Sequence, residues 1–417
     1  MRSLPILILS ILIGACRGGA LETASEDPPP TSGKYPPYPT PNWVVGEYGK
    51  GGALWFEPFL AHKVHFGAQG DFVVLGSDIT TGDAGALRIA GNGQLDSSFG
   101  AGGRVALSPG LPVWVGTPVP LADGRLLILG AYKEAQQVIA YGIRPNGLLE
   151  MDVAQPIAST ECDTFPTGTT TTGALALVAF ASGAGACKSP HRFSIARVGA
   201  RGLDPTFGEK GLVGIEVDLG PEQYAVSDGA DGMVVAGITN AGAVLVHVDK
   251  DGRLDSRYGE GGLVRFPDAL SVHQILHHVD GTLLRLGYNG REAIVRLTKD
   301  GKRDEEFGTR GELGGPLTLW LALDSEERIV VFGVPNGPPQ HSGEFGRFRR
   351  FSASGEEDPS FLALDGSPTE QCLPETCSKE LMGCASSAST QLIGMNVAGD
   401  HVLIVEDRCA FKVRYKG

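Results

Sequence analysis

A unit of about 52 residues recurs along this chain, and the repetition limits the folds open to it. Four copies share one pattern: LRIAGNGQLDSSFGAGGRV (87–105), IARVGARGLDPTFGEKGLV (195–213), VHVDKDGRLDSRYGEGGLV (246–264) and VRLTKDGKRDEEFGTRGEL (295–313). Decayed copies occupy 141–153 and 348–362, and VVGEYGKGGAL (44–54) carries only the second half. The aromatic of each copy, or its equivalent, is Tyr48, Phe99, Val153, Phe207, Tyr258, Phe307 and Phe361, at spacings of 51, 54, 54, 51, 49 and 54 residues. Such a period indicates a repeat architecture.

Each unit predicts about four short strands. Apolar segments follow Asp-Gly turns in DGRLLILG (123–130), DGMVVAGI (231–238) and DGTLLRLG (280–287), as expected of strands bounded by tight turns. Glycine supplies 60 of the 417 residues, about twice the usual share of ~7%. No apolar stripe of helical period crosses these segments. Seven four-stranded sheets in series predict an all-β fold, a seven-bladed β-propeller.

The two ends of the repeat region predict how the propeller closes. A small sheet leaves both apolar faces in water unless it packs on neighbours, and a closed ring leaves no end sheet uncovered. The repeats begin with the half-motif at 44–54 and end with AFKVRYKG (410–417), which resembles the strand that would precede such a motif. We therefore expect the amino- and carboxy-terminal segments to complete one blade, with residues 42–417 forming the propeller.

The amino terminus has the features of an export signal and a lipid anchor. MRSLPILILSILIGAC places Arg2 before an apolar run and ends in small residues, as signal peptides do. The run is about ten residues long, roughly half the ~20 that a transmembrane helix needs. Its last four residues resemble the bacterial lipobox, which implies cleavage between Ala15 and Cys16 and lipidation of Cys16. Residues 1–15 are thus predicted to be the signal peptide, and the proline-rich segment 16–41 an extended, flexible tether.

The repeat strings resemble the delta-60 repeat family, whose pattern runs roughly R-L-x-x-D-G-x-L-D-x-x-F-G-x-x-G. The resemblance covers residues 42–417, although the copies near Met151 and Glu357 have lost the FG pair and Lys302-Arg303 replaces the usual apolar residue before Asp304. The family occurs in bacterial surface and secreted proteins, and membership implies a propeller-like body. It implies no common chemistry.

Six cysteines remain after Cys16, an even number that suits disulfides in an oxidising compartment. Cys162 and Cys187 lie in one repeat and are expected to pair with each other. The last repeat holds Cys372, Cys377, Cys384 and Cys409, which allow three pairings. A zinc site is the alternative for the first three of these four, but their spacings lack a CxxC pair.

One aspartate recurs at the same position of five repeats: Asp96, Asp204, Asp255, Asp304 and Asp358. The recurrence could indicate a ring of ligands or catalytic acids. A structural role explains it better, because a carboxylate beside a glycine turn accepts backbone N–H bonds and every blade needs such a turn.

Other residues that suggest chemistry have simpler explanations. Asp249, Asp251 and Asp255 faintly resemble a calcium loop but lack its distant glutamate, so a hairpin turn is expected. His273 and His277 would share one face of a straight strand ~13 Å apart, too far to bind one metal, and His278 adjoins them. The sequence contains no HExxH, GxSxG or P-loop motif, and no cofactor is predicted.

These features together favour a binding protein of the bacterial cell envelope. The net charge of −13 disfavours nucleic acid as a partner. We expect a monomer that is held by its lipid at the outer membrane or cell surface, that binds a protein or a glycan, and that catalyses nothing. The alternative is an envelope enzyme, a lyase, lactonase or glycosidase, that uses the propeller's central channel.

Overall fold

The computed structural model describes residues 48, 53–56, 58–67, 70–108, 114–115, 118–121, 123–132, 137–159, 164–172, 175–182, 192–199, 202–217, 219–220, 223–230, 232–315, 318–333, 347–359, 361, 392–398, 401–406 and 409–414. These residues form strands joined by turns, and none of them is helical. This part of the chain accordingly holds no helix with the length and hydropathy of a membrane span.

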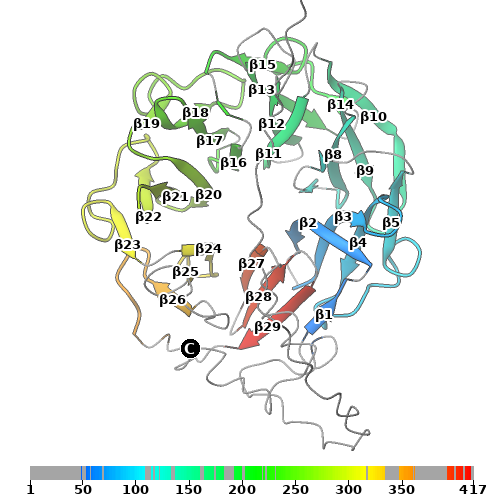
Figure 1. Ribbon diagram of the computed structural model, residues 1–417. Coiled ribbons are helices and arrows are strands. Elements are labelled where there is room, and N and C mark those ends of the chain that lie inside the picture. The colour runs from blue at the N-terminus through cyan, green and yellow to red at the C-terminus, as the bar shows by residue number, and fades with distance from the viewer. Residues whose placement is uncertain are drawn as a thin grey trace, which may run out of the picture. The chain divides into compact units, whose positions relative to one another are not determined.

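Seven antiparallel sheets, called blades 1 to 7, surround a common axis (Figure 1). Blade 1 contains β2 (Phe59–Phe66), β3 (Phe72–Asp78), β4 (Ala84–Ile89) and β5 (Arg104–Ser108). Blade 2 contains β6 (Trp114–Val115), β7 (Val119–Pro120), β8 (Leu126–Tyr132), β9 (Gln137–Ile143) and β10 (Leu149–Ser159). Blade 3 contains β11 (Thr164–Thr172), β12 (Leu175–Ser182), β13 (Arg192–Gly199), β14 (Gly202–Leu203) and β15 (Leu212–Ile215). Blade 4 contains β16 (Gln223–Ser227), β17 (Met233–Thr239), β18 (Gly242–Val248) and β19 (Leu263–Phe266).

The remaining blades follow the same order. Blade 5 contains β20 (Ser271–His278), β21 (Gly281–Tyr288), β22 (Arg291–Thr298) and β23 (Glu312–Gly315). Blade 6 shows three strands within the described ranges, β24 (Thr318–Leu323), β25 (Ile329–Gly333) and β26 (Arg347–Phe351). Blade 7 contains β27 (Leu392–Ala398), β28 (His401–Glu406), β29 (Cys409–Arg414) and, from the amino-terminal side, β1 (Ala53–Trp55). The predicted all-β, seven-bladed propeller is confirmed.

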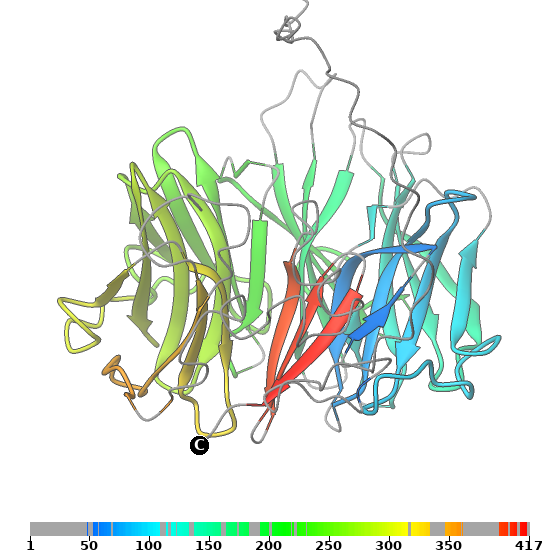
Figure 2. The same cartoon turned by 60° about the horizontal axis from the view of Figure 1, so that its bottom comes forward.

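The ring closes by pairing the two ends of the propeller region. β1 pairs antiparallel with β29, with Ala53 opposite Phe411 and Trp55 opposite Cys409. Both views show the amino-terminal strand β1 beside the carboxy-terminal sheet (Figures 1 and 2). The prediction that the terminal segments complete one blade is therefore confirmed.

Both faces of the blades are buried against their neighbours, as closure requires. Leu284 and Leu286 of blade 5 pack with Val234 of blade 4, and Leu283, on the other face of the same strand, packs with Leu321 of blade 6. The repeat aromatics lie in these layers, since Tyr48, Phe99, Phe207, Tyr258, Phe307 and Phe361 are each at most 4% exposed. Val153 lies in β10, and its side chain is outside the described residues.

The second variable position of the FGxxG segment has a left-handed backbone. Gly102 and Gly261 occupy it with φ of 63° and 64°, whereas Lys210 and Arg310 occupy it with φ of 55° and 56°. A left-handed conformation costs an L-residue with a side chain roughly 1–2 kcal/mol, and glycine avoids this cost. Two of the four clearest repeats therefore carry local backbone strain.

We predict that Arg310→Gly raises the free energy of unfolding by about 0.5–1 kcal/mol, because the relief of strain exceeds the added entropy of the unfolded chain. Urea denaturation measures the change. The matched control is Thr309→Gly, one residue earlier and outside the left-handed region, which should lower the stability. Equal effects of the two substitutions would refute the explanation.

Candidate functional site

An ion pair recurs in the repeats, and in blades 3, 5 and 6 its arginine is stacked on the repeat aromatic. In blade 5, Arg296 Nε donates to Asp304 Oδ2 at 2.7 Å, and its guanidinium lies 4.7 Å from the ring centre of Phe307. Asp304 Oδ1 also accepts the backbone N–H of Glu306 at 3.2 Å. The same ion pair joins Arg88 to Asp96 (3.4 Å), Arg197 to Asp204 (2.9 Å) and Arg350 to Asp358 (2.6 Å). We call the basic residue, the aspartate and the aromatic the inter-blade motif.

The inter-blade motif also joins neighbouring blades at four boundaries, between blades 1 and 2, 3 and 4, 4 and 5, and 5 and 6. The N–H of Gly308 donates to the carbonyl of Ser354 in blade 6 at 2.9 Å, and Arg296 donates to the neighbouring carbonyl of Ala353. Gly100 and Gly259 make the same backbone bond to Asn146 and Asp300, each at 2.8 Å. Because these bonds are made between blades, the repeated residues hold the ring together.

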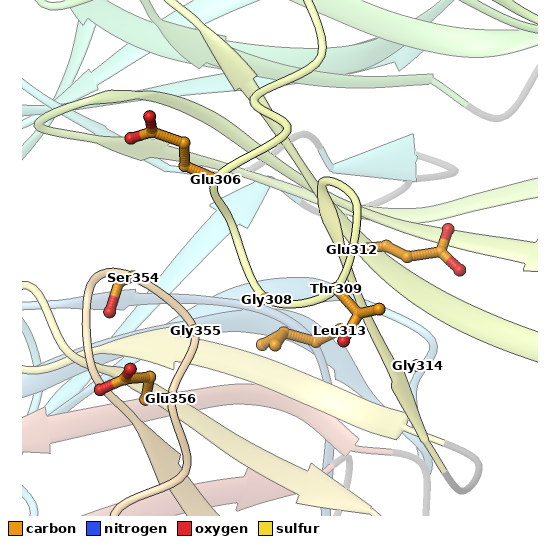
Figure 3. A pocket seen from close by; sticks show the side chains of 9 residues that line it. All are labelled: Glu306, Gly308, Thr309, Glu312, Leu313, Gly314, Ser354, Gly355 and Glu356. Atoms are coloured by element: carbon orange, nitrogen blue, oxygen red, sulfur yellow. The ribbon is translucent and has the colours of Figure 1, made fainter.

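A recess of about 260 Å³ lies beside this contact, between blade 5 and the hairpin turn of blade 6. Three carboxylates line it, those of Glu306, Glu312 and Glu356, and Figure 3 shows their side chains directed away from one another. Within the described ranges no cluster of three histidine, cysteine, aspartate or glutamate side chains could hold a metal ion. We assign this recess to the packing of the two blades.

Two blades change the residues of the inter-blade motif. Blade 4 has His247 in place of arginine, with Nε2 2.9 Å from Asp228 Oδ2, Nδ1 3.5 Å from Asp255 Oδ2 and the ring 4.8 Å from that of Tyr258. In blade 2 Arg125 supplies the cation and contacts Glu150 at 2.7 Å. In both blades a basic side chain still contacts the carboxylate of the motif.

The structure thus places all five predicted aspartates in the inter-blade motif rather than around the axis. Hydrogen bonds from Ser98 and from Arg257 lower the pKa of Asp96 and of Asp255, respectively, so both are ionised at neutral pH. The sequence reasoning missed the basic partner. Its signal was a basic residue or histidine seven or eight positions before each aspartate, as in Arg296 before Asp304.

The first strand of every blade lies nearest the axis (Figure 1). We call these the inner strands: β2, β6 with β7, β11, β16, β20, β24 and β27. Their described residues include no aspartate or glutamate, although the chain has 48. Their basic residues are Lys63 and five of the nine histidines, His62, His65, His273, His277 and His278.

A β-bulge interrupts the register of five inner strands at a similar depth. The shift falls between Ala61 and Lys63 in β2 and between Val272 and Gln274 in β20, and also within β11, β24 and β27. The residues passed over in β2 and β20 are His62 and His273. Bulges re-aim side chains and are frequent beside functional sites.

In blade 1 a glycine of the second strand lies opposite the bulge, where Ala61 pairs with Gly76. A Cβ on Gly76 would lie 1.9 Å from the carbonyl oxygen of Leu60. A Cβ on Gly287 would lie 2.3 Å from Ser271 Oγ and 2.8 Å from His273 Nε2. At Gly76 the clash is with the backbone of the inner strand, so only glycine leaves room there, whereas at Gly287 the close atoms belong to side chains.

Blade 5 carries a polar cluster that the repeat does not require. His273 Nε2 lies 2.8 Å from Ser271 Oγ and 3.6 Å from Glu292 Oε1, and Glu292 Oε2 lies 4.0 Å from Arg285 Nε. Burial lowers the pKa of Arg285. By cross-strand register, the equivalents of Arg285 in blades 1, 3 and 4 are Leu75, Ala179 and Ala236, all fully buried and apolar.

The polar cluster does not have the geometry of a catalytic triad. In a triad the nucleophile and the acid bind opposite nitrogens of the imidazole, so that the acid fixes the tautomer that accepts the proton. Here Ser271 and Glu292 both approach Nε2 of His273. The contacts within the cluster therefore do not form a proton relay of this kind.

The other predicted histidines and the calcium-like turn lie apart from this cluster. Because the bulge falls at His273, the straight-strand spacing to His277 does not describe β20. His278 is fully buried and its Nε2 lies 3.2 Å from the carbonyl oxygen of Glu327. Asp249 Oδ1 accepts the backbone N–H groups of Asp251 and Arg253 at 2.9 and 2.8 Å, which forms a hairpin turn.

Cys409, the first residue of β29, is fully buried and disulfide-bonded. The other predicted cysteines and the cleavage site, Ala15, Cys16, Cys162, Cys187, Cys372, Cys377 and Cys384, lie outside the described residues. In the register of blade 3, Thr164 lies opposite Ser182. Cys162 is two residues before the first of these and Cys187 five after the second. The pairing stays a prediction.

Solved structures of other propeller proteins resemble this chain. A prolyl endopeptidase is 12% identical over 72% of this chain and 42% of its own, with a TM-score of 0.47, so this chain spans less than half of that protein. The polysaccharide lyase Uly1 is 9% identical over 88% and 91%, with a TM-score of 0.48. The calcium-binding protein regucalcin from Agrobacterium tumefaciens is 16% identical over 72% and 90%, with a TM-score of 0.38. No protein-family model and no curated protein matches the sequence.

Proposed function

We propose that this protein is a lipid-anchored propeller of the bacterial cell envelope that binds a protein or a glycan and is not an enzyme. One observation carries the proposal. The five repeated aspartates are held in the inter-blade motif, and the described inner strands bear no carboxylate. A pair of carboxylates for general acid–base chemistry is therefore missing from the described wall around the axis.

The ligand is expected on the face opposite the inter-blade motif. The turns between first and second strands, and those between third and fourth strands, lie on one face of the ring, because antiparallel strands reverse direction at each turn. The links between blades, and the turns between second and third strands, lie on the other face of the ring. Blade 5 has its polar cluster near that second face, since Ser271 begins β20 and Glu292 follows the hairpin between β21 and β22.

Site-specific photo-crosslinking in intact cells tests this orientation. Leu270, in the link between blades 4 and 5, is 64% exposed, and Leu148, in a turn on the inter-blade-motif face, is 54% exposed. A photoreactive residue at 270 should capture a partner or glycan-bearing molecule that the matched position 148 does not. Capture of the same species at 148 alone would refute the assignment of the binding face.

The lipid anchor is tested by Cys16→Ser. We expect the variant to leave the membrane fraction, because the acylated thiol is lost and several acyl chains are needed for firm anchoring. Fractionation of cells and immunoblotting measure the change, with Ser25→Ala in the predicted tether, which keeps the thiol of Cys16, as the control. Retention of the Cys16 variant in the membrane would refute the anchor.

An enzyme is the second candidate, because Ser271 and His273 form a hydrogen-bonded pair beside Glu292. If the cluster catalysed hydrolysis or elimination, the wild-type protein should turn over lactones or acidic glycans. The His273→Ala variant should then lose that turnover. A wild-type protein that binds a glycan without any product in chromatography would leave binding as its function.

A further inference from the structure

Several asparagines of this chain are followed directly by glycine, a pair that can react with itself. The backbone nitrogen of the glycine attacks the side-chain amide carbon of the asparagine, because no Cβ shields that nitrogen. A bond forms between this nitrogen and Cγ, the Cγ–Nδ2 bond breaks, and ammonia leaves with the proton of the glycine N–H. Water then opens the resulting succinimide to aspartate or isoaspartate. The pairs begin at Asn92, Asn146, Asn289 and Asn336, of which the last lies outside the described residues.

The pairs in blades 1 and 2 are held by hydrogen bonds on both reacting groups. In each pair the glycine N–H donates to the carbonyl two residues before the asparagine, and the asparagine Oδ1 accepts the N–H of the residue after the glycine. Nucleophile and electrophile must therefore each give up a bond before a succinimide can form. These bonds run from Gly93 to Ala90 and from Gly147 to Arg144, each at 2.8 Å, and from Gln94 to Asn92 and from Leu148 to Asn146, each at 3.1 Å.

The pair in blade 5 has neither of these bonds. Asn289 and Gly290 form the turn between β21 and β22, whose closing pair is Tyr288 and Arg291. Both residues of the turn are exposed. Among the described residues, nothing accepts the Gly290 N–H or binds the Asn289 side chain. A Cβ on Gly290 would meet nothing within 4 Å, so the space around the attacking nitrogen is open.

We propose that Asn289 is a site of spontaneous deamidation, in which attack by the Gly290 nitrogen converts it to aspartate and isoaspartate. The equivalent turn of blade 4 is not reactive in this way. There Asn240 precedes Ala241, which has a Cβ and whose N–H donates to Thr239 Oγ1 at 3.1 Å. The free, glycine-bounded amide is thus a departure of blade 5 from its neighbour.

The reaction would change the charge and the backbone of this turn, which lies on the face where the ligand is expected. Aspartate adds a carboxylate next to Arg291, whose guanidinium lies 4.4 Å from the ring centre of Tyr288 and 3.0 Å from Glu312. Isoaspartate also inserts a methylene group into the main chain of a two-residue turn, so the closing pair must shift. The chemistry itself does not depend on the proposed binding function.

Peptide mapping of the mature full-length protein, kept folded at mildly alkaline pH, tests the proposal. Trypsin cuts after Arg285 and Arg291, so Asn289 is the only asparagine in its peptide. Mass spectrometry follows the loss of the amide, and an isoaspartate-specific methyltransferase labels the rearranged product. Because two hydrogen bonds of about 1 kcal/mol each must break at Asn92 and Asn146, Asn289 should convert about tenfold faster or more.

The matched control is the same chain in guanidinium chloride. All three asparagines are followed by glycine, so without the fold their rates should be similar. Asn289→Gln should remove the label from peptide 286–291 and leave the other two rates unchanged. Similar rates at the three sites of the folded protein would overturn the proposal, as would faster conversion at Asn92 or Asn146. Complete protection of Asn289 by folding would overturn it as well.

Discussion

Replacing Arg296 with alanine should lower the free energy of unfolding by about 3 kcal/mol. Arg296 is 6% exposed, pairs with Asp304, stacks on Phe307 and donates across the blade boundary to Ala353. Its removal leaves a shielded carboxylate without its cation and breaks the contact to blade 6. Denaturation of the soluble chain from residue 42 in urea measures the loss.

The matched control is Arg291→Ala in the same strand. The side chain of Arg291 is 49% exposed and pairs with Glu312 at 3.0 Å, so its loss should cost no more than about 1 kcal/mol. If the two variants lost the same stability, the inter-blade motif would not be what holds adjacent blades together.

A chain that begins at Phe59 should fail to fold, whereas one that begins at residue 42 should be a monomer rich in strands. The shorter chain lacks β1, which pairs with β29, and the aromatic rings of Tyr48 and Phe56, which are 1% and 2% exposed. Loss of each large core side chain costs about 3–5 kcal/mol, and whole domains are stable by only about 5–15 kcal/mol.

Size-exclusion chromatography and circular dichroism distinguish the two chains. The chain from Phe59 is expected in aggregates, because the exposed edge of β29 is a template for further strand pairing. A folded monomer with the melting temperature of the longer chain would show that the ring does not need its amino-terminal strand.

The repeat strings predicted the parts of the fold that depend on local pattern. Turn glycines, strand length and the buried aromatics Phe99, Phe207 and Phe307 all follow from residues close in sequence. The half-motif at 44–54 predicted closure, because the strand that would precede such a motif occurs at the other end of the repeat region, at 410–417. The burial of Tyr48 follows from the same argument.

The candidate site could not be predicted in the same way. His273 was read as part of a straight strand, whereas the bulge in β20 places it beside Ser271 and Glu292. Glu292 lies two strands away, and nothing near it in sequence indicates its partner. Arg285 resembles a surface residue until the register shows that its equivalents in other blades are buried and apolar.

By itself, the sequence determined the number of blades and the way the ring closes, because these depend on a period and on turn chemistry that each repeat carries locally. Only the tertiary structure decided which charges meet. The partners of Asp304, Glu292 and His273 depend on cross-strand register, on a one-residue bulge and on contact with the next blade, and these are settled by packing rather than by any short segment of the chain.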